Sequence, residues 1–246
     1  MLIAIIADIH ANDLAFEACL AEAKALKVER FVFLGDLVGY GPEPDGVVQR
    51  VAGLTAAGAI TIKGNHDDAV ENPDDDMSPA AAAAIAWTRC MLSDRSKDFL
   101  ASLPMFAEIG DMLFVHADAS SPSEWNYVTG IVSARRSLAA TQARITFCGH
   151  VHVPQVFCRT ADGKLATRIL VKAAGVPLSE KHQWLVVVGS VGQPRDGDPA
   201  AAFATYDTET RIVTSRRVPY DAEAVAARIM NEGLPASLAR RLVVGR

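Results

Sequence analysis

The chain has 246 residues, of which 50% are hydrophobic and 22% are charged, an ordinary composition for a globular protein. Its formal net charge of −5 argues against general binding to nucleic acids or anionic membranes, so any charge that attracts a phosphate must be local. No apolar run approaches the roughly 20 residues that span a bilayer, and the N-terminal run lacks the basic segment of a signal peptide.

The first 65 residues alternate between apolar runs of strand length and helical patterns. Asn12 or Asp13 can cap the first helix, which runs to about Leu26. The predicted strands are Leu2–Ala7, Arg30–Leu34 and Ala59–Ile62, and the second helix is Asp45–Ala57. Strands that alternate with helices in this way predict a parallel sheet with right-handed crossovers, whose ligands lie beyond the carboxyl ends of the strands.

The middle and the end of the chain add helices first and then mostly strands. We expect an exposed acidic loop over Asn72–Pro79, a helix over Pro79–Leu92 capped by Ser78, and a shorter helix over Lys97–Ser102. The later strands are predicted at Met105–Ile109, Met112–His116, Ile145–Cys148, Gln155–Cys158, Thr167–Val171, Trp184–Val188, Ala202–Tyr206 and Ile212–Arg216. Further helices are predicted near Val132–Thr141, Asp221–Met230 and Ser237–Leu242. This pattern predicts an α/β protein of two β-sheets packed face to face with helices outside, forming a single domain over residues 1–246.

The four cysteines stand at no paired spacing such as CxxC. They are Cys19, Cys90, Cys148 and Cys158, and their surroundings predict buried free thiols. Buried free thiols suit a reducing compartment, so we expect a cytoplasmic protein. The sequence leaves the oligomeric state open.

Polar side chains of an unusual kind follow several of the predicted strands. Asp8 and His10 stand two residues apart where the first strand ends, and His150 and His152 repeat this spacing later. Side chains at positions i and i+2 of an extended chain share a face, so each pair can reach one ion. The same kind of position is held by Asp36, Asn65 and His116.

The histidines are concentrated in these strand-end motifs. Five of the six lie within them, and we interpret His182 as a surface residue. A single strand-end histidine usually finds an ordinary hydrogen bond, but so many buried imidazoles and carboxylates together are costly without a metal. The set as a whole therefore predicts a metal site.

The order DIH, GDLVGYG, GNHD, VH and GHVH resembles the calcineurin-like metallophosphoesterases, in particular the compact bacterial and archaeal phosphodiesterases of the YfcE type. The motifs run from Asp8 to His152, and the stretch GSVGQPRDGDPAA extends the likeness to about Ala202. The resemblance implies a four-layer αββα sandwich of two mixed sheets and a two-metal site.

The resemblance also implies how the ligands divide between the metals. One metal would be held by Asp8, His10 and His152, the second by Asn65, His116 and His150, and Asp36 would bridge both. Mixed nitrogen and oxygen ligands suit Mn, Fe, Co, Ni or Zn better than Mg or Ca, and we expect manganese first.

The expected reaction is hydrolysis of a small phosphoester. Two cations about 3.5–4 Å apart can clamp the phosphoryl oxygens and acidify a water that attacks phosphorus. By the same resemblance, His66 would face the substrate as a proton donor or a hydrogen-bond donor to the transition state, with Asp67 as its orienting partner.

Two departures from relatives bear on the expected reaction. Protein serine/threonine phosphatases and symmetrical dinucleoside tetraphosphatases of this superfamily carry an arginine after the second strand, where this chain has Gly39–Tyr40. This difference argues against both of these activities. The stretch after His116 reads VHADASSP where many compact relatives have VHGSP, so contacts to the leaving group are altered.

Two side chains have alternative interpretations. Arg195 either binds the substrate phosphate or forms a surface ion pair in a turn. Tyr40 either stacks on a nucleobase or packs its loop.

An alternative function is a protein-binding scaffold of the same fold, as in a retromer subunit with an impaired metal site. The complete ligand set together with His66 favours the enzyme.

Overall fold

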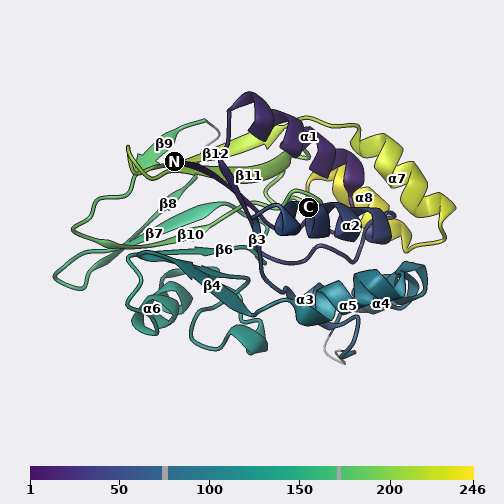
Figure 1. Cartoon of the computed structure of the whole chain (residues 1–246), viewed down its shortest axis with the longest axis horizontal. Helices are drawn as coiled ribbons and strands as arrows, with labels where there is room; N and C mark the ends of the chain where they lie inside the picture. Colours follow the sequence, from purple (N-terminus) through teal and green to yellow (C-terminus); the bar gives the residue numbers. More distant parts are fainter. Residues whose placement is uncertain (74–76, 171–172) are drawn as a thin grey trace.

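The computed structural model describes residues 1–73, 77–170 and 173–246. It contains two six-stranded mixed sheets with helices on their outer faces, so the predicted α/β sandwich is confirmed. The prediction of one domain over residues 1–246 stays a prediction. In Figure 1 the helices α1 and α2 lie on one side of the strands and α6 lies on the other.

The first sheet has the strand order β3-β2-β1-β11-β12-β9. Its three neighbouring N-terminal strands are parallel, as predicted, and β11, β12 and β9 continue the sheet in antiparallel fashion. The strands are β1 (Leu2–Ile6), β2 (Arg30–Phe33), β3 (Ile60–Thr61), β9 (Gly175–Pro177), β11 (Ala201–Asp207) and β12 (Ile212–Val218).

The second sheet has the strand order β4-β5-β6-β10-β7-β8. Here too three neighbouring strands, β5, β6 and β10, are parallel, and the others pair antiparallel. The strands are β4 (Phe106–Ile109), β5 (Met112–Val115), β6 (Ile145–Cys148), β7 (Gln155–Arg159), β8 (Leu165–Ile169) and β10 (Gln183–Val187).

Alternate residues along a strand pack in different hydrophobic cores. In β1, Ile3 and Ile5 face the second sheet and pack with residues such as Phe147, whereas Ala4 and Ile6 pack against α1 and α2. The outer face of the second sheet packs on α6. Three cores between four layers follow from this alternation, because successive side chains of a strand point to opposite faces.

The helices flank the sheets and form one further hairpin. Asn12 caps the first helix by accepting from the Ala15 N–H, as its position predicts. The helices are α1 (Asp13–Ala25), α2 (Pro44–Ala56), α3 (Asn65–Asp68), α4 (Pro79–Met91), α5 (Asp94–Ser102), α6 (Ile131–Ala139), α7 (Ala222–Asn231) and α8 (Ala236–Val244), with a 3-10 turn η1 (Pro122–Glu124). The pair α7–α8 packs against α4 through a separate apolar cluster.

Some predictions need correction or lie outside the described residues. The short strand β9 and the single turn α3 were not predicted, since elements of three or four residues have no clear periodicity. Cys19 and Cys148 are buried as predicted, but Cys90 is exposed and Cys158 is only half-buried, at the margin of the core between the two sheets. Part of the acidic loop, residues 74–76, and the end of the strand predicted over Thr167–Val171 fall outside the described part of the chain.

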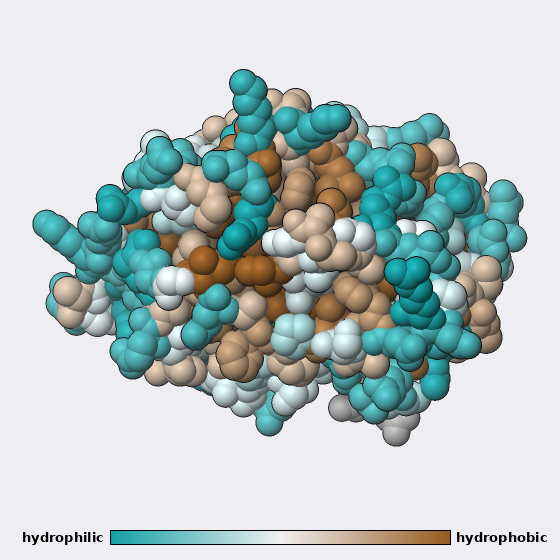
Figure 2. Space-filling model, in the orientation of Figure 1, coloured by the Kyte–Doolittle hydropathy of each residue, from teal (hydrophilic) through white to brown (hydrophobic). Residues whose placement is uncertain are grey.

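Within the described ranges, no helix has both the length and the apolar character needed to cross a membrane. On the face in view, polar residues surround apolar residues that show through near the middle (Figure 2).

Candidate metal centre

Six parallel strands, three in each sheet, deliver loops to one place. The loops after β1 and β2 carry Asp8, His10 and Asp36, and Asn65 begins the short helix α3 after β3. The loops after β5 and β6 carry His116, His150 and His152. The two sheets are joined at this point by a bridge between Ala7 and Ser190, the latter in the loop after β10. Carboxyl ends of parallel strands therefore supply every one of the predicted site residues in this set.

The backbone is left-handed at five of the seven predicted metal ligands. The φ angles are positive at Asp8, His10, Asp36, His150 and His152, with values from 49° to 67°. The expectation that each i, i+2 pair shares a face of an extended chain is therefore wrong, because the strands have already ended. Left-handed conformations of such residues cost about 1–3 kcal/mol each and persist where surrounding structure imposes them, which is typical of functional sites.

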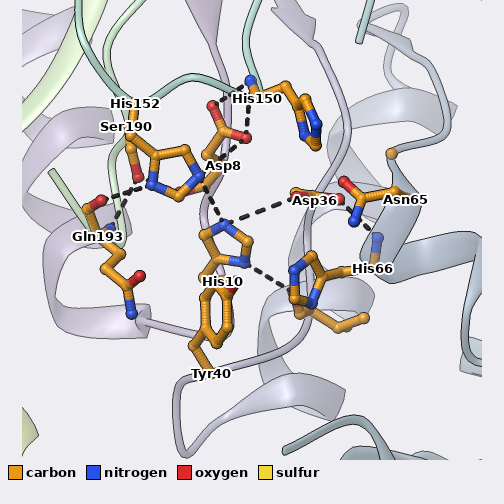
Figure 3. A network of polar contacts seen from close by, with 12 residues as sticks. Asp8, His10, Asp36, Tyr40, Asn65, His66, His150, His152, Ser190 and Gln193 are labelled. Atoms are coloured by element: carbon orange, nitrogen blue, oxygen red, sulfur yellow. Dashed lines mark hydrogen bonds and ion pairs between the residues drawn. The ribbon is translucent and has the colours of Figure 1, made fainter. Parts of the chain in front are cut away.

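The potential ligand atoms form two buried groups that share one residue. Asp8, His10, Asp36 and His152 form the first group, and Asp36, His116 and His150 form the second; within each, the ligand atoms lie within 4.8 Å of one another. We call these the first and the second cluster. The Oδ1 of Asn65 lies 3.1 Å from His116 Nε2 and so adds an oxygen to the second cluster. Figure 3 shows residues of both clusters converging on Asp36.

Asp36 is placed to contact both clusters with a single oxygen. Its Oδ2 lies 3.6 Å from His10 Nε2 and 3.5 Å from His116 Nε2. Its Oδ1 accepts a hydrogen bond of 2.8 Å from the backbone N–H of His66, which fixes the carboxylate plane. One oxygen is therefore held by the protein and the other is left between the clusters.

The histidines of the first cluster direct their lone pairs at each other. His10 Nδ1 lies 3.1 Å from the carbonyl oxygen of Val38, and His152 Nδ1 lies 2.6 Å from that of Gln193. A carbonyl oxygen only accepts, so both Nδ1 atoms carry the hydrogen and both Nε2 atoms are unprotonated in the neutral rings. These two Nε2 atoms are 3.2 Å apart. Two facing lone pairs repel, and a cation between them removes the repulsion, so the donor set fits a metal.

The pKa shifts of the buried side chains also indicate a site for cations. Burial raises the pKa of Asp8 to about 7, although the histidine His116 nearby lowers it. Burial also raises the pKa of Asp36 well above its usual range and lowers the pKa values of His10, His150 and His152 well below theirs. Buried carboxylates and neutral imidazoles together lack a compensating positive charge, which divalent cations provide.

His66 lies beside the clusters with its side chain in the cleft. Its ring is 4.4 Å from the Tyr40 ring and 4.9 Å from the His10 ring, measured between centroids. Its Nδ1 is buried without a hydrogen-bond partner among the described residues. Burial lowers the pKa of His66 to about 3, so this imidazole is neutral near pH 7.

Asp67 does not orient His66. Its Oδ1 accepts hydrogen bonds from the backbone N–H groups of Leu37 and Val38, and its Oδ2 accepts one from Gly64. The carboxylate thus joins the loop after β2 to the start of α3. The predicted pairing is wrong because the loop amides satisfy both oxygens.

Arg195 and Tyr40 lie together at the cleft. The guanidinium of Arg195 donates to the Tyr40 hydroxyl at 3.4 Å and to Gln193 Oε1 at 3.1 Å. These partners are neutral, so Arg195 forms no surface ion pair with any residue that the structure describes. Tyr40 is 8% exposed and packs against His10 and His66, in agreement with the packing interpretation. His182 lies beside Trp184, just before β10 and at the opposite end of that strand from the site. It is half-buried and so less exposed than predicted.

Sequence reasoning missed several residues around the clusters. Ser190 Oγ donates to the carbonyl oxygen of Asp8 and accepts from the Gln193 N–H, both at 2.8 Å, and so supports the first cluster. The GSVGQ stretch beside Arg195 was a signal for these two residues. Trp125, Tyr127 and Arg241 line a cleft of about 480 Å³ over the clusters, together with Asp36, Tyr40, Asn65, His66, Met77, Ser78, Ala81, Glu124, His150, His152 and Arg195.

Comparisons with known proteins agree with this geometry. The pattern of the calcineurin-like phosphoesterase superfamily domain matches residues 1–211. The uncharacterized protein MJ0912 of Methanocaldococcus jannaschii is 32% identical over 251 residues, which cover 100% of this chain and 98% of that protein.

Two solved structures are also similar over the full length of this chain. A metallophosphoesterase from Sphaerobacter thermophilus is 35% identical with a TM-score of 0.88, over 100% of this chain and 99% of that chain. The hypothetical protein PH1004 from Pyrococcus horikoshii OT3 is 20% identical with a TM-score of 0.79, over 100% and 98% of the two chains, and shares the fold. The structural neighbours also include the E. coli phosphoesterase YfcE, 17% identical over 89% of this chain and 100% of that chain, with a TM-score of 0.45. The chain belongs to the calcineurin-like phosphoesterase superfamily and is a metallophosphoesterase with two His/Asp clusters fit for a dinuclear metal site.

Proposed function

We propose that the protein hydrolyses a small phosphoester with two divalent transition-metal ions. One ion would be held by Asp8, His10 and His152, and the other by Asn65, His116 and His150. Asp36 would serve both ions, since its Oδ2 lies near residues of both clusters. The bound ions supply Lewis acidity toward the phosphoryl oxygens and lower the pKa of a water molecule.

The contact between His10 and His152 carries this proposal. Their Nε2 atoms lie 3.2 Å apart while both Nδ1 atoms face backbone carbonyl oxygens. A scaffold without metal has no physical reason to hold two buried lone pairs in opposition, because each then lacks a partner. The same geometry fixes the tautomer that leaves Nε2 available as a metal ligand.

The donor set supports a transition metal. Four imidazoles, two carboxylates and one amide oxygen mix nitrogen with oxygen, whereas Mg and Ca prefer oxygen alone. We propose manganese, with Fe, Zn, Ni and Co as the other candidates. We further propose a cytoplasmic protein whose partner is the phosphoester itself.

His66 acts on the substrate as a hydrogen-bond donor. The prediction allowed either a proton donor or a hydrogen-bond donor, and a pKa of about 3 favours the neutral donor. Cations in the two clusters would lower this pKa further by repulsion. Arg195 binds a phosphoryl oxygen, since its guanidinium lines the same cleft and its Nε is buried without a partner among the described residues.

The test is manganese-dependent hydrolysis of bis-p-nitrophenyl phosphate by the wild type and by Asp36→Asn. This change keeps the shape of the side chain but takes the shared charge from both ions, so we expect a loss of at least about 100-fold in kcat/KM. Asp162→Asn, at an exposed turn, is the matched control and should leave the rate unchanged. Equal rates for Asp36→Asn and wild type would refute the proposal. Two bound metals with no turnover of any ester would support the scaffold.

A further inference from the structure

The cleft over the clusters is larger than a phosphate group requires. Its volume of about 480 Å³ lies within the roughly 300–1,000 Å³ typical of small-molecule sites. The clusters occupy only part of its lining, so the remaining side chains face whatever group is esterified to the phosphate. The chemistry of those side chains therefore indicates the class of substrate.

Two aromatic rings stand directly over the second cluster. The ring of Tyr127 stacks on that of His150, with centroids 4.0 Å apart and an interplanar angle of 21°, yet this tyrosine is 53% exposed. The ring of Trp125 meets that of His116 edge-on at 5.7 Å. Trp125 also has a left-handed backbone, with φ of 52°, an uncommon conformation for a bulky residue. We call this pair the aromatic wall; it lies where a flat group attached to the reacting phosphate would rest.

Two arginines line the same cleft, and neither has a carboxylate partner among the described residues. Within those residues, Arg195 donates to the neutral oxygens of Tyr40 and Gln193. Arg241 forms no ion pair among the residues that the structure describes, whereas Arg217 and Arg228 do. Unpaired cations in a cleft attract anionic groups.

Arg241 reaches the cleft from outside the part of the chain that matches the superfamily. It lies on α8, beyond residue 211, and α8 packs through Leu238 and Leu242 into the cluster that contains Tyr40 and Ala81. The C-terminal hairpin α7–α8 is seen beside α1 and α2 in Figure 1. The helix α8, which lies beyond the residues that the family pattern matches, thus contributes a side chain to the lining of the cleft.

We propose that the cleft selects a nucleotide-type phosphoester, whose base stacks on Trp125 and Tyr127 and whose additional phosphate binds Arg241. The proposal rests on the proposed function, because the reacting phosphate is placed at the two clusters. It adds the class of the substrate. A base has a flat π-face that stacks on aromatic side chains without sequence-specific contacts, and a further phosphate accepts from a guanidinium.

Competitive inhibition tests this by removing one group at a time. Inhibition constants of adenosine 5′-monophosphate, ribose 5-phosphate and adenosine 5′-diphosphate are measured against bis-p-nitrophenyl phosphate at constant, saturating free manganese. The monophosphate should inhibit about 5- to 150-fold more strongly than ribose 5-phosphate, the range expected for base stacking. The diphosphate should inhibit at least about threefold more strongly than the monophosphate.

Variants test which side chains cause the preference for the base and which cause the preference for the second phosphate. Trp125→Ala should bring the ratio of monophosphate to ribose 5-phosphate inhibition close to one, and Phe106→Ala, an exposed ring outside the cleft, should leave it unchanged. Tyr127→Ala, at a side chain already 53% exposed, should reduce the same ratio without loss of folding. Arg241→Gln should abolish the gain from the second phosphate, and Arg240→Gln, its neighbour on α8 outside the cleft, should keep it.

Equal inhibition by adenosine 5′-monophosphate and ribose 5-phosphate, or a ratio that survives both aromatic variants, would overturn the base site. A gain from the second phosphate that persists in Arg241→Gln would overturn the anion site. If the wild type does not hydrolyse the chromogenic ester, the proposed function fails by itself. Calorimetric titration of the manganese-loaded protein with the same three ligands then still tests the binding preferences.

Discussion

Ser190→Ala removes one hydroxyl group that connects three parts of the metal centre. Ser190 is fully buried; its Oγ donates to the Asp8 carbonyl oxygen and accepts from the Gln193 N–H, both at 2.8 Å. The carbonyl oxygen of Gln193 in turn holds Nδ1 of His152 at 2.6 Å. The hydroxyl therefore supports two ligands of the first cluster, one through its backbone and one through its ring.

The expected magnitude follows from these contacts. Without the hydroxyl, the Gln193 N–H loses its partner in a buried place, which costs about 1–3 kcal/mol. The Asp8 carbonyl oxygen keeps a second donor, the Gly192 N–H at 2.8 Å, so its loss is smaller. For a chain of this length, about 1–3 kcal/mol corresponds to a fall in Tm of roughly 2–12 °C. Loss of support behind a ligand typically weakens metal binding by about 10- to 100-fold.

The assay combines thermal unfolding of the metal-free protein with calorimetric titration of Mn²⁺. Ser102→Ala is the matched control, because Ser102 is exposed and its hydroxyl donates to the carbonyl oxygen of Phe99 within its own helix. We expect both Tm and metal affinity to fall for Ser190→Ala and neither to change by much for the control. A lower Tm with unchanged metal affinity would refute the reasoning, since the hydroxyl would then stabilise the fold alone.

Three other predictions follow from the site. His66→Gln should keep two metal ions per chain by elemental analysis while turnover falls about 10²- to 10³-fold, the loss expected for one hydrogen-bond donor to the transition state. Loss of metal would instead make this residue structural. Gly192→Ala should lower the Tm and the metal content, because a Cβ there would lie 1.8 Å from the Ile9 carbonyl oxygen. Gly46→Ala serves as the control, since its Cβ would meet nothing within 4 Å. An unchanged Tm for Gly192→Ala would contradict this prediction. The third concerns pH. Burial raises the pKa of Asp8 from its usual value of 3.8 to about 7, so the metal-free fold favours the protonated carboxyl. Its contribution to stability is therefore fully present below pH 3.8 and is lost as the pH rises through 7. Manganese replaces that proton, so the rise in Tm that Mn²⁺ produces should be larger at pH 8 than at pH 6, and a rise independent of pH would count against the assignment.

The strand ends could be predicted because their signal is local. Apolar runs of strand length precede Asp8, Asp36 and His116, and parallel strands bring such ends to one edge. The order of the motifs then indicated the superfamily, which the comparisons confirm.

Details that depend on contacts distant in the sequence could not be predicted. Asp67 contacts the amides of Leu37 and Val38, 30 and 29 positions away, and no local pattern reveals that choice of partner. The left-handed backbone at Asp8 and His10 arises from pairing with the loop after β2, in which the His10 N–H donates to the carbonyl oxygen of Asp36.

The substrate cleft was the least predictable part. The aromatic pair Trp125 and Tyr127 follows a 3-10 turn in the loop after His116. The departure of this loop from relatives predicts altered contacts to the leaving group, but it does not predict the position of the two rings. Arg241 lies on a helix whose pattern predicts only an amphipathic surface element, and its place at the cleft depends on how α8 packs against α4.

Anomalous diffraction from crystals of the manganese-loaded protein is the most direct measurement of the central claim. The account predicts two peaks about 3.5–4 Å apart, one between His10 and His152 and one beside His116, with Asp36 Oδ2 between them. A single peak, or peaks away from Asp36, would contradict it.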